Sequence, residues 1–248
     1  MVTSINRKSP IPYYIQVQNK LTESINQGQW RPGDKLPGEH QLCEMFNVSR
    51  TVIRQALDQL EQEKIIYREK GRGTFVAQPT IKKRFVQNLI GFYEDMVEQG
   101  YTVFSKMLRL EVIPAKSTVA GKLEIEPNTK VIYMERLRFV DDEPITLTRT
   151  YLPYDLCPQV IDADFSYSSL YAFIENECAL SIARGIRIIE AVSTTEYESK
   201  NLQIPVGSPL ILIKSISYQV DGTPLEYYEA LHRGDRSQFE VELVRMKS

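Results

Sequence analysis

The 248-residue chain has little of the chemistry on which disulfide frameworks and metal sites depend, because it holds only three cysteines and two histidines. Cys43, Cys157 and Cys178 are widely spaced and form no CxxC pair. This argues against a disulfide framework or a structural zinc site and fits a reducing cytoplasm. No apolar run approaches the ~20 residues that span a bilayer, and the N-terminus lacks the apolar segment of a signal peptide. We therefore expect a cytoplasmic protein with no metal, no cofactor and no membrane partner.

The near-zero formal charge of -2 conceals an asymmetry between the two parts of the chain. Residues 1–84 hold 14 Lys and Arg against 8 Asp and Glu, whereas residues 85–248 hold 16 against 24. A basic head joined to an acidic body suits a protein whose head alone contacts a polyanion. Chance clustering of solvated surface charge is the alternative, and charge alone does not separate the two.

Three helices are predicted in the basic part. Apolar residues recur at helical spacing from Tyr14 to Ile25, and a second helix is expected to begin after Pro37. The Asn47-Val48 pair suits a tight corner, since Asn tolerates a left-handed backbone. Ser49 can cap a third helix that runs to about residue 63.

A hairpin is predicted directly after these helices. Residues 65–68 and 74–77 alternate like short strands around the glycine-rich segment 69–73. Helix, turn, helix and hairpin in this order predict a winged helix-turn-helix.

The third helix carries the residues that could read base edges. Its apolar stripe faces a small core, which leaves Arg50, Thr51, Arg54 and Gln55 on the opposite side. Either arginine could pair with guanine, Gln55 with adenine, and Thr51 with a thymine methyl group or a phosphate. A solvated charge is the ordinary role of any one such residue, so the hypothesis of DNA binding rests on the whole pattern.

Residues at helix starts and at the hairpin tip could set the register on the DNA backbone. Phosphate contacts normally do this, and His40, Ser49, Lys70 and Arg72 are placed for them. Gly71 and Gly73 would let the hairpin approach a groove, or could serve only the turn itself.

Residues 10–77 resemble the winged helix-turn-helix of GntR-type bacterial transcription regulators. The resemblance lies in Pro12–Gln16, Gly33–Glu39, Val48–Leu57 and Gly71–Val76. It implies DNA contacts by His40, Ser49, Arg50, Thr51, Arg54, Gly71 and Arg72. Gly38 stands where relatives usually carry Ser or Ala, which should weaken the cap of the second helix. We therefore expect a DNA-binding domain over residues 1–77.

The rest of the chain predicts an α+β domain. Residues 78–88 are polar and basic without a clear period, which indicates a linker, and residues 89–248 form the second domain. Strands are expected at 103–113, 130–140, 145–152, 185–197, 209–220 and 224–232, and helices at 89–100, 115–123 and 168–178. The segments 141–144 and 221–224 read as hairpin turns, so the sheet should be mostly antiparallel.

Arg136 and Arg138 are the most informative pair in this domain. Two residues apart on a strand, they share one face of the sheet. Two adjacent guanidiniums repel unless an anion or carboxylates lie between them. Phosphate is a natural partner, and pairing with Glu or Asp on a neighbouring strand is the alternative.

This domain resembles the UTRA ligand-binding domain of the HutC branch of GntR regulators, which has a chorismate-lyase-like α+β fold. The resemblance lies in Phe92–Met96, Arg136–Arg138, Glu143–Ile145, Tyr151–Pro153, Ser169–Tyr171 and Arg233–Arg236. In sugar-phosphate-sensing relatives the paired arginines bind the phosphate. The resemblance implies that Ser169, Tyr171, Gly91 and Phe92 assist there and that Glu226 meets sugar hydroxyls.

Three positions of the implied effector site depart from the family pattern. Gly91 stands where Ser is common, which leaves only its N–H as a donor. Thr148 occupies a position often held by Glu in amino-sugar sensors, and His232 replaces a frequent aromatic residue. The anion half of the site is therefore kept better than the sugar half, and a phosphorylated or otherwise anionic metabolite is expected.

Together these features predict a homodimeric, effector-controlled transcriptional regulator that binds double-stranded operator DNA, most often a repressor in this family. An enzyme of the chorismate-lyase type fused to a DNA-binding head is one alternative. It is disfavoured because no acid/base pair surrounds the arginines, and no catalytic residue is expected. An effector-independent DNA-binding protein with a structural body is the other.

Overall fold

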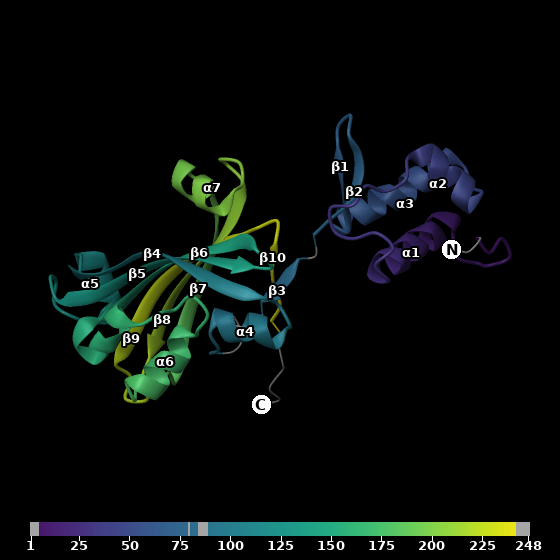
Figure 1. Cartoon of the computed structure of the whole chain (residues 1–248). Coiled ribbons are helices and arrows are strands. Elements are labelled where there is room, and N and C mark those ends of the chain that lie inside the picture. Colours follow the sequence, from purple (N-terminus) through teal and green to yellow (C-terminus); the bar gives the residue numbers. More distant parts are fainter. Residues whose placement is uncertain (1–4, 79, 84–88, 242–248) are drawn as a thin grey trace, which may run out of the picture. The chain divides into compact units, whose positions relative to one another are not determined.

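The computed structural model describes residues 5–78, 80–83 and 89–241. The chain divides into two compact units, residues 1–79 and 80–248, each with its own core (Figure 1). We call them the head and the body.

The head has the three helices and the hairpin that the sequence predicts. Its elements are α1 (Tyr13–Asn26), α2 (Glu39–Phe46), α3 (Arg50–Gln62), β1 (Ile66–Glu69) and β2 (Gly73–Val76). The two strands pair antiparallel and form the wing. A bridge between Lys35 and Phe75 joins the segment before α2 to the wing.

The corner between α2 and α3 follows from its residues. Asn47 ends α2 in the left-handed region, with φ 52°, which Asn tolerates better than most residues. The hydroxyl of Ser49 caps α3 by accepting from the Val52 N–H at 3.5 Å. The expected weak start of α2 is present too, because Gly38 has no side chain to cap it and only donates its N–H to Gln41 Oε1.

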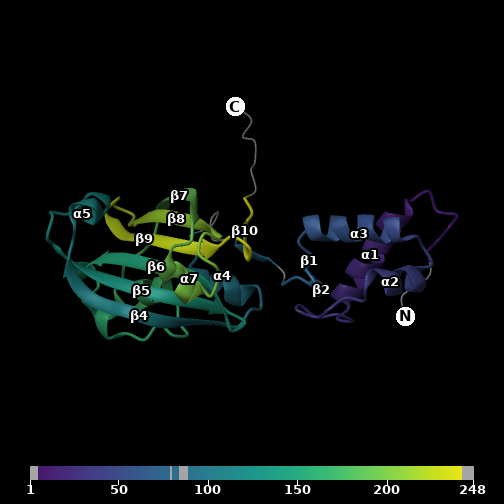
Figure 2. The same cartoon turned by 90° about the horizontal axis from the view of Figure 1, so that it is seen from above.

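The body is built on one six-stranded antiparallel sheet (Figure 2). Its strands are β4 (Val103–Pro114), β5 (Lys130–Val140), β6 (Glu143–Pro153), β7 (Arg184–Ser193), β8 (Pro209–Tyr218) and β9 (Pro224–Arg233). Their order across the sheet is β4-β5-β6-β9-β8-β7, so β4 and β7 are the two edges. The α+β fold predicted from the sequence is confirmed.

Helices lie around this sheet. They are α4 (Phe92–Glu98), α5 (Ser117–Leu123), α6 (Leu170–Glu177) and α7 (Glu196–Leu202), with 3-10 turns η1 (Tyr154–Leu156) and η2 (Pro158–Asp162). The strand expected over 185–197 ends at Ser193, because Thr195 begins α7: its hydroxyl and its N–H both donate to Glu198. Thr195 and Glu198 have the spacing of a helix-capping pair, which indicates a helix start. The strand-like alternation over 185–197 led to the longer strand prediction instead.

The expected linker over residues 78–88 is not structureless. Strand β3 (Ile81–Lys83) lies within it and pairs in parallel with β10 (Ser237–Phe239). Ile81 is buried and packs with Phe92, Tyr228 and Ala230 of the body. This long-range pairing has no local sequence signal. Arg84, expected to share the basic linker with the lysines before it, lies outside the described residues.

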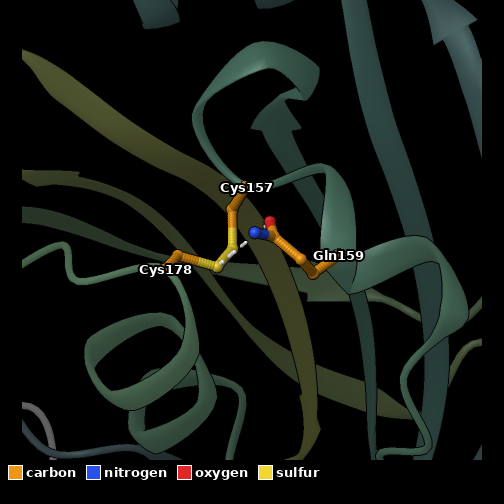
Figure 3. The surroundings of a disulfide bond; sticks show 3 residues. All are labelled: Cys157, Gln159 and Cys178. Carbon is orange, nitrogen blue, oxygen red and sulfur yellow. Dashed lines mark hydrogen bonds between the residues drawn. A yellow bond between two sulfur atoms is a disulfide. The ribbon is translucent and has the colours of Figure 1, made fainter.

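The expectation that the cysteines form no disulfide is wrong for one pair. Cys157 and Cys178 are joined by a disulfide, with Cα atoms 5.5 Å apart (Figure 3). The bond links the start of η2 to the end of α6, and the Gln159 side-chain oxygen lies 3.8 Å from Cys178 Sγ. These elements meet only in the tertiary fold, so spacing along the sequence gives no sign of the bond. Cys43, in the head, is free.

Among the described residues, no helix combines the length and the apolar character needed to cross a membrane.

Because each unit has a separate core, a cavity in one core should act on that unit alone. Leu57 is buried in the head core, and Leu57→Ala should lower the free energy of unfolding of the head by about 2–5 kcal/mol. Hydrogen exchange of the full chain should show faster exchange across α1–α3 and unchanged exchange in β5, β6 and β9. Leu147→Ala, in the body core, is the matched variant and should do the reverse. Equal loss of protection in both units after either change would contradict two independent cores.

Candidate functional site: a DNA-reading face and an anion pocket

The third helix of the head presents the expected basic and amide residues to solvent. Val52 is half-buried and Ile53 and Ala56 are buried, whereas Arg50, Thr51, Arg54 and Gln55 are all exposed. The helix therefore packs by one stripe and leaves the opposite face open, as a groove-reading helix does.

Several basic residues of the head that were expected to contact DNA lie against acids instead. Arg50 Nε donates to Glu39 Oε2 at 2.6 Å although its side chain is 76% exposed. His40 lies 3.4 Å from Glu44, and Arg72 pairs with Glu69. These partners would compete with DNA. Arg54 is exposed and has no ion-pair partner within the described part of the chain. Its guanidinium therefore need not break an ion pair with these residues before it contacts a base.

The wing is joined to α3 by ion pairs. Arg68, on β1, pairs with Asp58 at 2.6 Å and with Glu61 at 3.2 Å, both on α3. Lys70, Gly71 and Arg72 stand exposed in the turn. Gly71 has φ 77° and Gly73 φ 131°, so the turn itself requires both glycines, and close approach to DNA is not needed to explain them.

In the body, strand pairing assembles a pocket on one face of the sheet. Arg138 lies opposite Thr146, and Thr146 lies opposite His232. One row further along, Arg136 pairs with Thr148. The pocket is lined by Ile90, Gly91, Phe92, Tyr93, Arg136, Arg138, Thr146, Thr148, Thr150, Ser169, Leu170, Tyr171, Arg187, Glu226, Tyr228, Ala230 and His232.

The two arginines are buried in this pocket without an acceptor. Arg136 is 2% exposed and Arg138 is 8% exposed. Arg136 lies over the ring of Phe165 at 5.8 Å, and Arg138 over the ring of Phe92 at 5.0 Å. Within the described residues neither guanidinium has a hydrogen-bond or ion-pair partner, and both Nε atoms are orphaned. The alternative that both pair with acids on a neighbouring strand is wrong, since the facing residues are threonines on β6 and a methionine and a serine on β4.

The electrostatics of the pocket follow from this burial. Desolvation, helped by the charge of Arg138, lowers the pKa of Arg136 well below its ordinary value. Desolvation also lowers the pKa of Arg138. Both shifts mean that burial in the pocket disfavours the charged form of the guanidiniums, an effect that a bound anion would reverse.

Glu226 is the single carboxylate of the pocket lining. It is 2% exposed and accepts from the Tyr171 hydroxyl at 2.8 Å and from the Ser217 hydroxyl at 3.3 Å. Burial raises the pKa of Glu226, and the hydrogen bond from Tyr171 opposes that shift. Because the Tyr171 proton is already donated to Glu226, this hydroxyl can serve an anion only after it rotates away.

Two helix starts border the pocket, and one N–H group at each is already hydrogen-bonded. The Ser169 hydroxyl caps α6 by accepting from the Ala172 N–H at 3.2 Å. The Gly91 N–H, at the start of α4, donates to Glu94 Oε2 at 2.7 Å. A Cβ at Gly91 would stand 2.8 Å from that carboxylate oxygen and 3.1 Å from Ser169 Oγ. Glycine at this position thus lets the two helix starts approach each other.

The pocket brings together all nine residues that the sequence marks as effector-binding. Their binding role stays a prediction. Arg187 and Tyr228 were not foreseen, although both could have been found by two-residue alternation on β7 and β9. The threonines at 146 and 150 needed the register of β6 against its neighbours.

Two domain families match the chain. The model described as "Bacterial regulatory proteins, gntR family" matches residues 13–76. The UTRA domain matches residues 98–238. The chain belongs to the GntR family of bacterial regulators and carries a UTRA domain.

Relatives align with this GntR-family regulator over almost the whole length of both chains. The transcriptional repressor NagR of Bacillus subtilis is 34% identical over 95% of this chain and 96% of its own. The mannosyl-D-glycerate transport/metabolism system repressor MngR of Escherichia coli is 32% identical over 96% of this chain and 98% of its own. The crystal structure of PhnF from Mycobacterium smegmatis, 27% identical, matches with a TM-score of 0.71 and covers 93% of this chain and 100% of that one. The regulator is thus a winged helix-turn-helix DNA-binding protein with an effector-binding body.

A buried guanidinium without an acceptor should lower the stability of the body. Arg136→Met keeps the volume and removes the charge, so the free energy of unfolding without ligand should rise by about 1–4 kcal/mol. Urea denaturation of the full chain measures this. Arg109→Met, on the exposed opposite face, is the matched control and should have little effect. A clear fall in stability for Arg136→Met would show that the guanidinium has a stabilising partner.

Proposed function

We propose that the protein is a cytoplasmic transcriptional repressor whose hold on its operator is controlled by a small phosphorylated metabolite. The observation that carries the proposal is the pair of buried, acceptor-free guanidiniums of Arg136 and Arg138 in the UTRA pocket. A location in the cytoplasm rests on DNA binding, since the disulfide removes the argument from cysteine usage.

The chemistry of the pocket favours a phosphate group at its arginine end. Two guanidiniums side by side offer more donors than one carboxylate can accept, whereas a phosphate monoester presents three oxygens and up to two charges. Neutral hydroxyls line the adjoining floor, from Thr146, Thr148 and Thr150. With Glu226 as the single acid in the lining, a neutral polyol fits the other end of the ligand better than an amine. The relatives' names, which include a mannosyl-D-glycerate system, support a carbohydrate-derived ligand.

We propose that two chains act together on DNA. A two-fold dimer presents two heads to the halves of an imperfect palindrome. Effector binding needs only to bias the spacing or order of the heads, because ~1–3 kcal/mol of coupling changes operator affinity by roughly 5- to 150-fold.

Two rival functions have distinct signatures. A lyase-type enzyme would consume its bound ligand. The pocket lining holds no carboxylate–histidine pair in contact that could serve as acid and base. His232 Nδ1 lies 2.9 Å from Thr146 Oγ1, and Glu226 bonds to hydroxyls. A purely structural body would show no response to any ligand. The relatives' names as transcriptional repressors favour regulation over both.

The role of Arg54 as a base reader can be separated from that of Lys70 as a phosphate contact. Binding sites would be selected from random duplexes with the wild-type protein. Arg54→Ala should then cost about 1–3 kcal/mol on the selected site and relax the preference at one base pair. Lys70→Ala should weaken binding to all duplexes alike and reduce the salt dependence by about one phosphate contact. An Arg54→Ala protein with operator affinity and base preference like the wild type would refute the assignment.

The anion pocket can be tested with defined probes. Glucose 6-phosphate should raise the melting temperature of the full chain, with stabilisation of ~2.7 kcal/mol at 100 times its Kd, whereas glucose should not. Inorganic phosphate should act more weakly, and glucosamine 6-phosphate less than glucose 6-phosphate because Thr148 offers no carboxylate to an amine. Arg138→Met should abolish the shift and Arg109→Ala should keep it. A shift that survives Arg138→Met places the ligand elsewhere.

A further inference from the structure

The edge strand β7 of the body is exposed in a way that soluble proteins usually avoid. In the described part of the chain it pairs only with β8, so its outer edge of backbone N–H and C=O groups is open (Figure 2). Ile186 and Ile188 are 47% and 49% exposed, and Ile189 is 48% exposed. A ten-residue edge strand with three exposed isoleucines is a template for another strand.

We propose that the outer edge of β7 pairs with the same strand of a second copy, antiparallel about a two-fold axis, to form one continuous sheet. The inference rests on the homodimer of the proposed function and names its interface. A second copy is the occupant because one antiparallel register of the strand against itself matches apolar with apolar and acidic with basic residues.

Two-fold symmetry restricts the registers that are possible. The axis must be perpendicular to the sheet, so residues that face each other lie on the same face and their numbers differ by an even amount. With the axis at Arg187, Ile186 faces the partner's Ile188 and Arg184 faces the partner's Glu190. Each of these pairs occurs twice by symmetry. Shifting the axis by one residue, to Ile188, places Ile186 against the partner's Glu190 and loses both the apolar and the ionic match.

The residues concerned lie on the face opposite the effector pocket. Arg184, Ile186, Ile188 and Glu190 alternate on β7, whereas Arg187 lies on the pocket side and lines that site. Arg184 stacks on Tyr218 at 3.9 Å, and Glu190 pairs with Lys214 at 2.6 Å. Both charged side chains are thus engaged by β8, the inner neighbour of β7, and each must share that contact or turn from it to meet a partner strand.

One pair opposes the association. Arg187 faces the partner's Arg187 across the axis, and like charges in this position repel. Its side chain interacts with Tyr228 within the pocket wall, which directs it away from the neighbouring strand. The arrangement also brings the two effector pockets next to the interface, which gives the effector a route to the dimer.

Charge reversal tests this register directly. Arg184→Glu places two acids opposite each other at both ends of the interface, and Glu190→Arg places two arginines there. Each variant alone should raise the dimer Kd of the full chain by roughly ten-fold or more. Mixing the two variants should restore a tight heterodimer, because each end then holds one opposite-charge pair. The Arg184→Glu/Glu190→Arg double variant should restore the homodimer. Sedimentation equilibrium measures all four.

Controls lie on the other edge of the sheet. Arg109→Glu and Glu111→Arg make the same reversals on β4 and should leave the dimer Kd unchanged. Ile188→Asp should dissociate the dimer, and Val112→Asp, an equally polar change on β4, should not. Melting temperatures near that of the wild type would show that each variant is folded.

Three results would overturn the proposal. The first is a wild-type chain that is monomeric at high concentration. The second is a dimer Kd of the charge-reversal variants within about two-fold of the wild-type value, and the third is a failure of the two single variants to form a tight heterodimer when mixed. The second and third would leave the regulatory function standing, because operator affinity and the anion-induced melting shift are measured independently. Loss of those two readouts in the wild-type protein would refute the function itself.

Discussion

Two buried positive charges on one face of a sheet are the constraint on which the body depends. Another arginine of the same sheet is paired with carboxylates, as buried charges usually are. On its other face, Arg149 donates to Glu135 at 2.9 Å and to Glu198 at 3.2 Å. Arg136 and Arg138 are more deeply buried and face threonines instead. An unpaired buried guanidinium is costly, and this cost is the basis of our proposal that an anionic ligand binds here. Under the proposed function, the unpaired guanidiniums lower the stability of the body and raise its affinity for an anion.

The same burial offers a path from the ligand to the rest of the chain. Arg138 lies over the ring of Phe92, and Phe92 packs in one cluster with Tyr228 and with Ile81 of β3. Strand β3 is the first element of the body after the head, and it is held by a three-residue pairing with β10. An anion that drew the arginines inward would shift Phe92 and change the packing of Ile81. So short a strand pair has a small free energy of opening, and ~1–3 kcal/mol of coupling would suffice to bias it.

Most of the fold, and much of the candidate site, could be predicted from local pattern. Ser49 and the apolar stripe of α3 define the reading helix, and alternation puts Arg136 and Arg138 on one face. The register of each strand against its neighbours could not be predicted from the sequence. Thr146 and Thr150 belong to the pocket because β6 pairs with β5 across an irregularity at Arg138 and Phe139. The disulfide and the β3–β10 pair likewise join segments distant in sequence, and their local residues carry no signal for either.

The most direct measurement of the central claim is thermodynamic reciprocity between the two ends of the molecule. One calorimetric titration would give the affinity of the full chain for glucose 6-phosphate, with and without a saturating selected operator duplex. A second would give its affinity for the operator, with and without the sugar phosphate. The account predicts the same factor in both directions, and its loss in the Arg138→Met protein. An affinity for the sugar phosphate that operator DNA leaves unchanged would contradict a link between the buried arginines and DNA binding.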